Sequence, residues 1–204
     1  MNVKTGMAAV AAALLGAVAL GSSLAAATSP ISISAAPRVV SATTDVRLFG
    51  RLTTGEPGQS VQVEMSECNG YGWRVLTHAE TTSLGAWETS VEPNVTTQFR
   101  ARWRKATSNV VTVRARPYIF TDNHHHQRLL VEVRANDFIP RALLERQSRK
   151  RWISVRSFAL GRGPFSSAAD LHLRLPRGTR VRIVLSQKQV GRCYLPAQTT
   201  TVLT

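Results

Sequence analysis

The densest group of residues that could bind a ligand lies in Glu145–Val155, the stretch ERQSRKRWISV. Guanidinium and ammonium groups at this density attract polyanions, and an adjacent indole can stack on a nucleobase. Arg149, Lys150, Arg151 and Trp152 are therefore the candidate polyanion-binding residues. The same stretch has a second interpretation, because a solvated β-hairpin turn flanked by polar residues would look similar in sequence.

A second candidate is the run His124-His125-His126, since neutral imidazoles are common metal ligands. Adjacent residues of a strand point to opposite faces, so three consecutive histidines converge on one ion only in a bent loop. Asp122 lies near them, but no cluster of cysteines or further carboxylates accompanies it in sequence. We therefore expect a solvated loop here, with neither a metal nor a cofactor.

Catalytic patterns are missing from the sequence. It contains no G-x-S-x-G, no H-E-x-x-H and no P-loop, and His78 and His172 each occur singly within predicted strands. Carboxylates at a spacing suited to acid–base catalysis are also missing. We predict that the chain is not an enzyme.

The first residues have the pattern of a secretory signal peptide. A short cationic start precedes an uncharged apolar run, whose strongest part, Met7–Leu20, is shorter than the roughly 20 residues that span a bilayer. Small residues at Ala25 and Ala27 form an A-x-A cleavage site. We predict a signal peptide over 1–27, no transmembrane span in the mature chain, and secretion to the extracellular space or cell envelope. The alternative is an uncleaved membrane anchor.

The segments after residue 28 alternate between apolar and polar residues and end in Gly, Pro, Asn or Ser. Val, Thr, Phe and Trp dominate them, as in strands. In the first half we expect strands at 31–40, 46–52, 61–67, 73–81, 86–91, 98–103 and 110–114. Short strands at this spacing predict an all-β fold, either a sandwich or a barrel.

A repeat divides the mature chain into two modules. Trp73, Gly85-Ala-Trp87, Pro93 and Thr97-Gln-Phe99-Arg100 recur in the same order and at similar spacing as Trp152, Gly163-Pro-Phe165, Pro176 and Thr179-Arg-Val181-Arg182. We predict two tandem β-sandwich domains of immunoglobulin-like or fibronectin-III-like type, at 28–116 and 117–204, following the signal peptide.

The pattern W-x-x-[LV]…G-x-[WF]…P…T-x-[FV]-R after a signal peptide resembles the secreted tandem immunoglobulin-like or fibronectin-III-like domains of actinobacteria and their relatives. The resemblance covers essentially the whole mature chain. Its motifs are structural, so it implies a fold and no catalytic residues. The tyrosine of a tyrosine corner is absent, with Phe99 and Val181 near its expected place.

The repeat aligns ERQSRKRW with SECNGYGW, so Ser148–Arg151 corresponds to a turn made of ordinary turn residues in the first module. This alignment predicts a hairpin tip at which cations replace glycines. A tip that is merely solvated and a true polyanion contact both remain open. A tryptophan at a repeated position favours a core role for Trp152 over stacking on a ligand.

The positive charge is unevenly distributed. The sequence has 26 Lys and Arg against 12 Asp and Glu, a formal net charge of +14. Residues 28–116 contain 10 cations and 7 acids, whereas residues 117–204 contain 15 and 5. The excess therefore belongs to the second module, and contacts made by it would be salt-sensitive and indifferent to sequence.

Cys68 and Cys193 are the two cysteines, and in a secreted chain they favour a disulfide. Loops of a sandwich alternate between two poles. Cys68, in the turn after the third strand, falls at the pole where the first module ends. Cys193, in the loop after the sixth strand, falls at the pole where the second begins. We predict that they bridge this junction; two free thiols or a link to another chain are the alternatives.

Together these features predict a secreted, non-catalytic binding or scaffold protein that contacts anionic envelope polymers through its basic C-terminal module. A protein partner at the cell surface is also compatible with them. The main alternative is a purely structural spacer without a ligand. Nucleic-acid binding would need aromatic residues interleaved with the cations, and only Trp152 offers that. Inhibition of a secreted enzyme would need an extended exposed loop, which we do not identify in the sequence.

Removal of the signal peptide is directly testable. N-terminal sequencing of secreted protein is expected to begin at Thr28 or Ala27, because the A-x-A site ends there. A retained Met1, with the protein in the membrane fraction, would overturn the predicted localisation.

Overall fold

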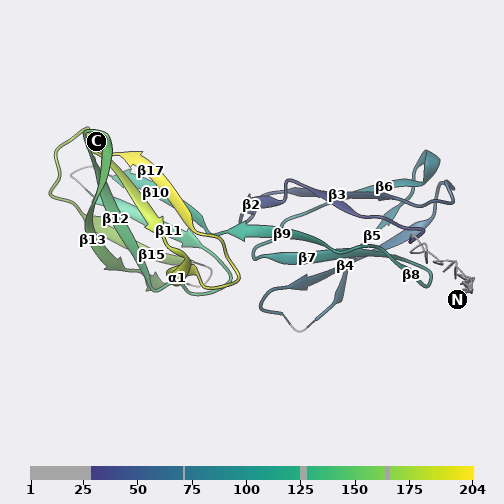
Figure 1. Cartoon of the computed structure of the whole chain (residues 1–204). Coiled ribbons are helices and arrows are strands. Elements are labelled where there is room, and N and C mark those ends of the chain that lie inside the picture. The colour runs from purple at the N-terminus through teal and green to yellow at the C-terminus, as the bar shows by residue number, and fades with distance from the viewer. Residues whose placement is uncertain (1–28, 71, 125–127, 164–165) are drawn as a thin grey trace, which may run out of the picture.

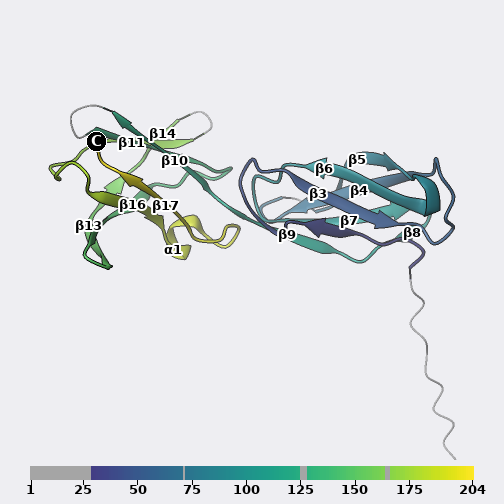
Figure 2. The same ribbon diagram turned by 90° about the horizontal axis from the view of Figure 1, so that it is seen from above.

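The computed structural model of the chain describes residues 29–70, 72–124, 128–163 and 166–204. The predicted signal peptide and its cleavage positions lie outside the described residues, as do His125, His126 and Phe165. Two β-sandwiches lie end to end and are joined through one continuous stretch of chain (Figures 1 and 2). No helix among the described residues is long and apolar enough to cross a membrane.

The first sandwich packs a three-stranded sheet against a larger one. The smaller sheet has the order β1-β3-β6, formed by Ser34–Ala36, Val46–Arg51 and Ala86–Val91. A 3₁₀ turn, η1, at Ser83–Gly85 precedes β6. The larger sheet has the order β2-β9-β7-β4-β5, formed by Val39–Ser41, Val111–Arg116, Thr97–Trp103, Ser60–Glu67 and Arg74–Glu80. The short strand β8, Ala106–Thr107, pairs with β7.

The second sandwich repeats this plan. One sheet has the order β10-β11-β15-β14, formed by Tyr118–His124, Arg128–Arg134, Ser167–His172 and Gly161–Arg162. The other has the order β13-β12-β16-β17, formed by Arg151–Ala159, Arg141–Ser148, Arg180–Leu185 and Ala197–Val202. A single-turn helix, α1 (Gln187–Val190), lies between β16 and β17. The prediction of two tandem immunoglobulin-like sandwiches is confirmed.

The two domains use the same strand order on one face, β5-β4-β7-β9 in the first and β13-β12-β16-β17 in the second. Alternation of apolar and polar residues explains the sheets: Val111, Val113 and Ala115 of β9 are buried, and the residues between them are exposed. Such alternation gives a sheet one dry and one wet face. The repeated sequence pattern therefore corresponds to a repeated structure.

One predicted strand is divided in the structure. The segment 31–40 forms β1, which pairs with β3 of the smaller sheet, and β2, which pairs in parallel with β9 of the larger sheet. Pro37 lies between them and has no N–H with which to continue a ladder. The prediction of one continuous strand there was wrong.

Each sandwich has its own apolar core. The first is centred on Trp87 and Phe99, which are 2% and 1% exposed. The second contains Leu129, Leu144 and Ile183. Burying side chains of this size from water stabilises a fold by about 1.5–3 kcal/mol each. Val95 and Ala115 precede the second sandwich in sequence but belong to its core cluster, so the two domains are packed together at the junction.

Gly50 of β3 tests the packing of the first core. A Cβ atom there would lie 1.9 Å from the carbonyl oxygen of Ser32 and 2.8 Å from Cζ2 of Trp87. G50A is therefore expected to lower the free energy of unfolding by about 3 kcal/mol, since overpacking against backbone has no cheap relaxation. Denaturant unfolding of the full chain measures this.

The matched control is Gly161 of β14, another strand glycine. A Cβ atom there would meet only the carbonyl oxygen of Ala168, at an ordinary 3.5 Å. G161A is expected to change stability by about 1 kcal/mol or less. Equal effects of the two substitutions would contradict the packing described around Trp87.

Candidate polyanion-binding surface

Arg149, Lys150 and Arg151 lie where the hairpin prediction placed them. β12 and β13 are antiparallel neighbours with Ser148 opposite Arg151, so Arg149 and Lys150 form the two-residue turn. All three cations are exposed, and none forms an ion pair within the described part of the chain. The prediction of a hairpin tip is confirmed, and its cations are fully available to solvent.

Arg149 has an unusual backbone conformation. Its φ of 55° lies in the left-handed region, and the first central position of such a two-residue turn usually carries glycine. An L-residue in this region costs about 1–2 kcal/mol relative to right-handed backbone. The turn between β7 and β8 repeats the arrangement with Arg104, φ 53°, followed by Lys105. Both domains thus carry Arg-Lys where glycine would be less strained.

The tip belongs to a larger cationic surface. Arg146 of β12 lies opposite Val181 of β16, which brings the start of β16 beside the end of β12. The loop 173–179 leads into β16 at that end, and its Gly178 N–H donates to the carbonyl of Leu203, 2.8 Å away. We call the exposed cations at this end the cationic pole: Arg146, Arg149, Lys150, Arg151, Arg174, Arg177 and Arg180.

The cationic pole lies at the end of the second domain away from the first (Figure 1). β12 starts near the junction side of the domain and runs away from it, so the β12–β13 turn lies at the free end. The hairpin tip was predictable from the sequence, whereas the part played by Arg146, Arg174, Arg177 and Arg180 was not. The sequence signal available for them was only their charge, because their approach to the tip depends on the strand order.

The carboxylates of the second domain leave the cationic pole largely uncompensated. Glu132 pairs with Arg134, Glu145 with Arg182 and Asp170 with Arg128. The hydrogen bond between Arg128 and Asp170 holds the pKa of the Arg128 guanidinium above its ordinary value. Asp122 is also engaged. Glu132, Glu145 and Asp170 therefore pair with cations outside the pole, and the exposed cations of the pole give that end of the domain a positive field.

Trp152 does not lie in the core, contrary to the sequence-based expectation. It is half-buried on the outer face of its sheet, and the guanidinium of Arg182 lies 4.5 Å from the ring centroid. Nε of Arg182 in turn donates to Oε2 of Glu145 at 2.5 Å. Arg182 therefore covers one face of the Trp152 ring, which leaves less of it for a ligand to stack on.

The first domain contains the same arrangement. The guanidinium of Arg100 lies 4.2 Å from the Trp73 centroid, and its Nε donates to Glu64 Oε2 at 2.6 Å. Burial raises the pKa of the Glu64 carboxyl, but hydrogen bonds and charges from Arg100 and Arg102 outweigh burial and hold that pKa below its ordinary value. The repeated Trp-Arg-Glu set thus explains the repeated tryptophan as part of the sheet surface.

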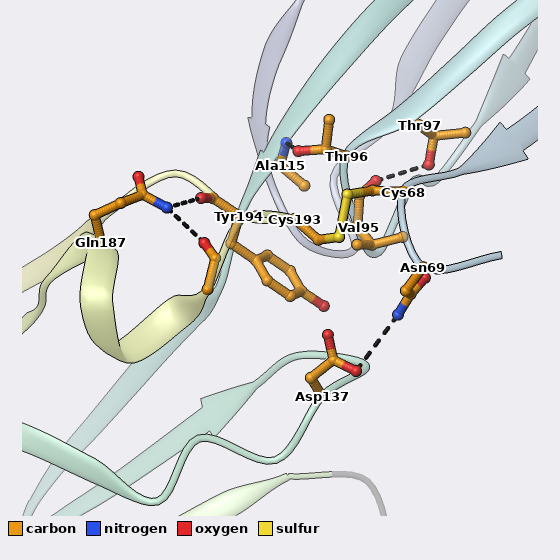
Figure 3. Close-up of a disulfide and its surroundings, with 11 residues drawn as sticks. Cys68, Asn69, Val95, Thr96, Thr97, Ala115, Asp137, Gln187, Cys193 and Tyr194 are labelled. Carbon is orange, nitrogen blue, oxygen red and sulfur yellow. Dashed lines mark hydrogen bonds between the residues drawn. A yellow bond between two sulfur atoms is a disulfide. The ribbon is translucent and has the colours of Figure 1, made fainter.

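A disulfide joins the two domains at their junction. Cys68 follows β4 and Cys193 follows α1, with their Cα atoms 5.5 Å apart, a usual separation for a bridge (Figure 3). Backbone hydrogen bonds accompany it, from Thr96 N–H to the Cys193 carbonyl at 3.1 Å and from Leu195 N–H to the Ala115 carbonyl at 2.8 Å. The predicted pairing is confirmed.

Side chains reinforce this junction. The amide of Asn69 donates to Asp137 across the interface at 3.4 Å (Figure 3). The Tyr194 hydroxyl accepts from the Asn136 N–H at 2.7 Å, and burial raises the pKa of this phenol. Nε2 of Gln187 donates to the Tyr194 carbonyl at 2.9 Å. The first of these bonds crosses between the domains, and the other two order the second-domain side of the junction.

The histidines form no metal site within the described residues. His78 lies in β5 and His172 in β15, as predicted, and His124 ends β10. His125 and His126 lie outside the described residues. Among the described residues, no group of three or more His, Cys, Asp or Glu could hold a metal ion.

Comparisons with known proteins concern the fold alone. No protein-family model and no curated protein sequence matches the chain. A solved cytokine receptor complex is similar at 10% identity and a TM-score of 0.33, over 85% of this chain and 95% of that one. The human OSCAR ligand-binding domain is similar at 12% identity and 0.27, over 86% and 100%. A second crystal form of the cytokine receptor complex gives 9% identity and 0.30, over 84% and 99%.

The disulfide makes a prediction for stability. It closes a loop with a sequence separation of 125 residues. Replacing both cysteines, as C68A/C193A, is expected to lower the free energy of unfolding by about 4–5 kcal/mol in the chain-entropy model. Denaturant unfolding of the oxidised parent and the double variant measures the difference. Unchanged stability, or a free Cys68 thiol in non-reducing peptide maps of secreted protein, would contradict the bridge.

Proposed function

We propose that this chain is a secreted, non-catalytic protein that contacts anionic polymers of the cell envelope, mainly through the cationic pole of its second domain. The observation that carries the proposal is the gathering of seven exposed cations, without carboxylate partners among the described residues, at one end of the molecule. The three that form the hairpin tip include Arg149, held in a backbone conformation that favours glycine. Strained residues of this kind concentrate at functional sites.

The chemistry of the cationic pole matches polymers that present repeated phosphate, sulfate or carboxylate groups. Guanidinium groups bind such oxyanions through forked, charge-assisted hydrogen bonds. Binding of this type releases counterions, so its affinity falls steeply with salt and depends little on polymer sequence. The interdomain disulfide fits an oxidising compartment, which is where envelope polymers occur.

A structural spacer is the second candidate, and the junction favours it. The disulfide and the backbone hydrogen bonds between the domains give a stiff two-domain rod, which suits a spacer as well as a binder. The two candidates differ in one respect: a spacer needs charge only for solubility and is indifferent to where its cations lie. Stacking on a nucleobase is disfavoured because Arg182 already occupies one face of the Trp152 ring.

The test compares variants with equal charge. In R149G/K150S/R151S the tip cations are removed, and glycine takes the left-handed position without strain. The mature full chain is expected to bind immobilised heparin or teichoic acid at low salt. The triple variant is expected to lower the magnitude of the slope of log affinity against log salt by about 2 to 3, since each lost anion contact removes roughly 0.7–0.9.

The control is R116S/K188S/R192S, which removes three exposed cations at the junction end of the molecule. It has the same net charge as the tip variant and should leave the salt slope almost unchanged. Equal losses for the two variants would mean that only net charge matters. No retention of the parent chain at low salt would reject polyanion binding and favour the spacer.

A further inference from the structure

A surface pocket of about 320 Å³ lies on the outer face of the first domain's larger sheet. Its lining consists of Ser60, Gln62, His78, Arg102 and Arg104. Every one of these side chains can donate a hydrogen bond, and none is a carboxylate. A lining in which every side chain can donate, with two guanidinium groups among them, is suited to an oxyanion.

The strand register explains why these side chains meet. Gln62 of β4 lies opposite Arg102 of β7 on one side and opposite His78 of β5 on the other. Ser60 is two residues from Gln62, so it lies on the same face. Arg104 follows in the β7–β8 turn. Three neighbouring strands and one turn therefore bring these five side chains together on the sheet, where Nε2 of Gln62 also donates to Glu64 at 2.8 Å.

Two of the donors are held in place by other contacts. Nη1 of Arg102 donates to Glu64 Oε1 at 3.1 Å, which fixes the guanidinium while leaving 43% of the side chain exposed. Arg104 lies with its guanidinium 4.3 Å from the Trp103 centroid, on a backbone with φ 53°. Side chains that are already ordered lose less entropy when a ligand binds.

The carboxylates nearby do not occupy the pocket. Glu64 is buried and accepts from Arg100, Arg102 and Gln62, so two guanidinium groups share its single charge, and it does not line the pocket. Glu80 is opposite Ser60 in the register and is exposed, but it does not line the pocket. Arg104 and His78 form no ion pair within the described residues. The pocket therefore keeps net positive charge.

We infer that this pocket is a binding site for a single phosphate or sulfate group, independent of the cationic pole. Its volume is at the small end of ligand pockets, which suits one tetrahedral oxyanion and the group attached to it. The pocket lies at the start of β4 and the end of β7. Cys68, after the end of β4, and Thr97, at the start of β7, lie at the junction, so the pocket is at the end of the first domain remote from it. The two anion sites thus occupy opposite ends of the molecule, and one protein can contact two anionic chains.

The test is an NMR titration of the mature full chain with inorganic phosphate, and separately with inorganic sulfate, at constant ionic strength kept with chloride. The backbone amides of Gln62, His78 and Arg102 are expected to shift. R104G removes one guanidinium without backbone strain and is expected to weaken binding at these amides by about tenfold or more. R149G makes the same Arg-to-Gly change at a left-handed turn position of the second domain, in the β12–β13 turn, and should leave this affinity within about twofold.

A second variant, H78A, keeps the inference falsifiable should R104G fail to fold, and it is expected to weaken binding as well. Tighter binding of phosphate assigns the site to phosphate groups, and tighter binding of sulfate assigns it to sulfate esters. Shifts confined to the cationic pole, or unaltered by both R104G and H78A, would overturn the inference and leave the proposed function standing. Shifts in the pocket together with no retention of the full chain on polyanion columns would support the inference and reject the proposed function.

Discussion

The Cys68–Cys193 disulfide is the constraint on which the arrangement of this molecule depends. It ties the turn after β4 in the first domain to the loop before β17 in the second, beside a linker that is itself hydrogen-bonded to both. Antiparallel strands send successive loops to opposite poles of a sandwich. Once one pole of each domain is fixed at the junction, the loops of the opposite pole of each domain must face away from it. The cationic pole and the first-domain pocket therefore lie at the two free ends.

The order of the strands then determines which charged side chains become neighbours. Within each sheet, acids such as Glu64 and Glu145 neutralise the arginines that cover the tryptophans, and these sets contribute to the fold. The cations at the loops have no such partners in the described structure. Because exposed like charges repel one another, a pole of seven cations destabilises the folded state slightly. Together with the left-handed arginine at the tip, this cost is easier to explain by an anionic partner than by solubility alone.

Much of the fold follows from local patterns in the sequence. Strict alternation in segments such as Val111–Arg116 identified the strands, and the repeated landmarks identified two domains of one design. Loop polarity then predicted the disulfide. The break between β1 and β2 was not predictable from alternation, because both halves are strands and only their partners differ. Trp152 was misplaced because a repeated tryptophan is equally consistent with a core and with an arginine-covered sheet surface.

The binding surface was predictable only in part, for a physical reason. Arg149, Lys150 and Arg151 are contiguous, whereas Arg174, Arg177 and Arg180 join them through the pairing of β12 with β16. The most direct measurement is hydrogen exchange of the full chain with and without a heparin fragment. We expect protection in peptides that cover the β12–β13 turn and the loop 173–179. Protection limited to the junction, or none at all, would contradict it.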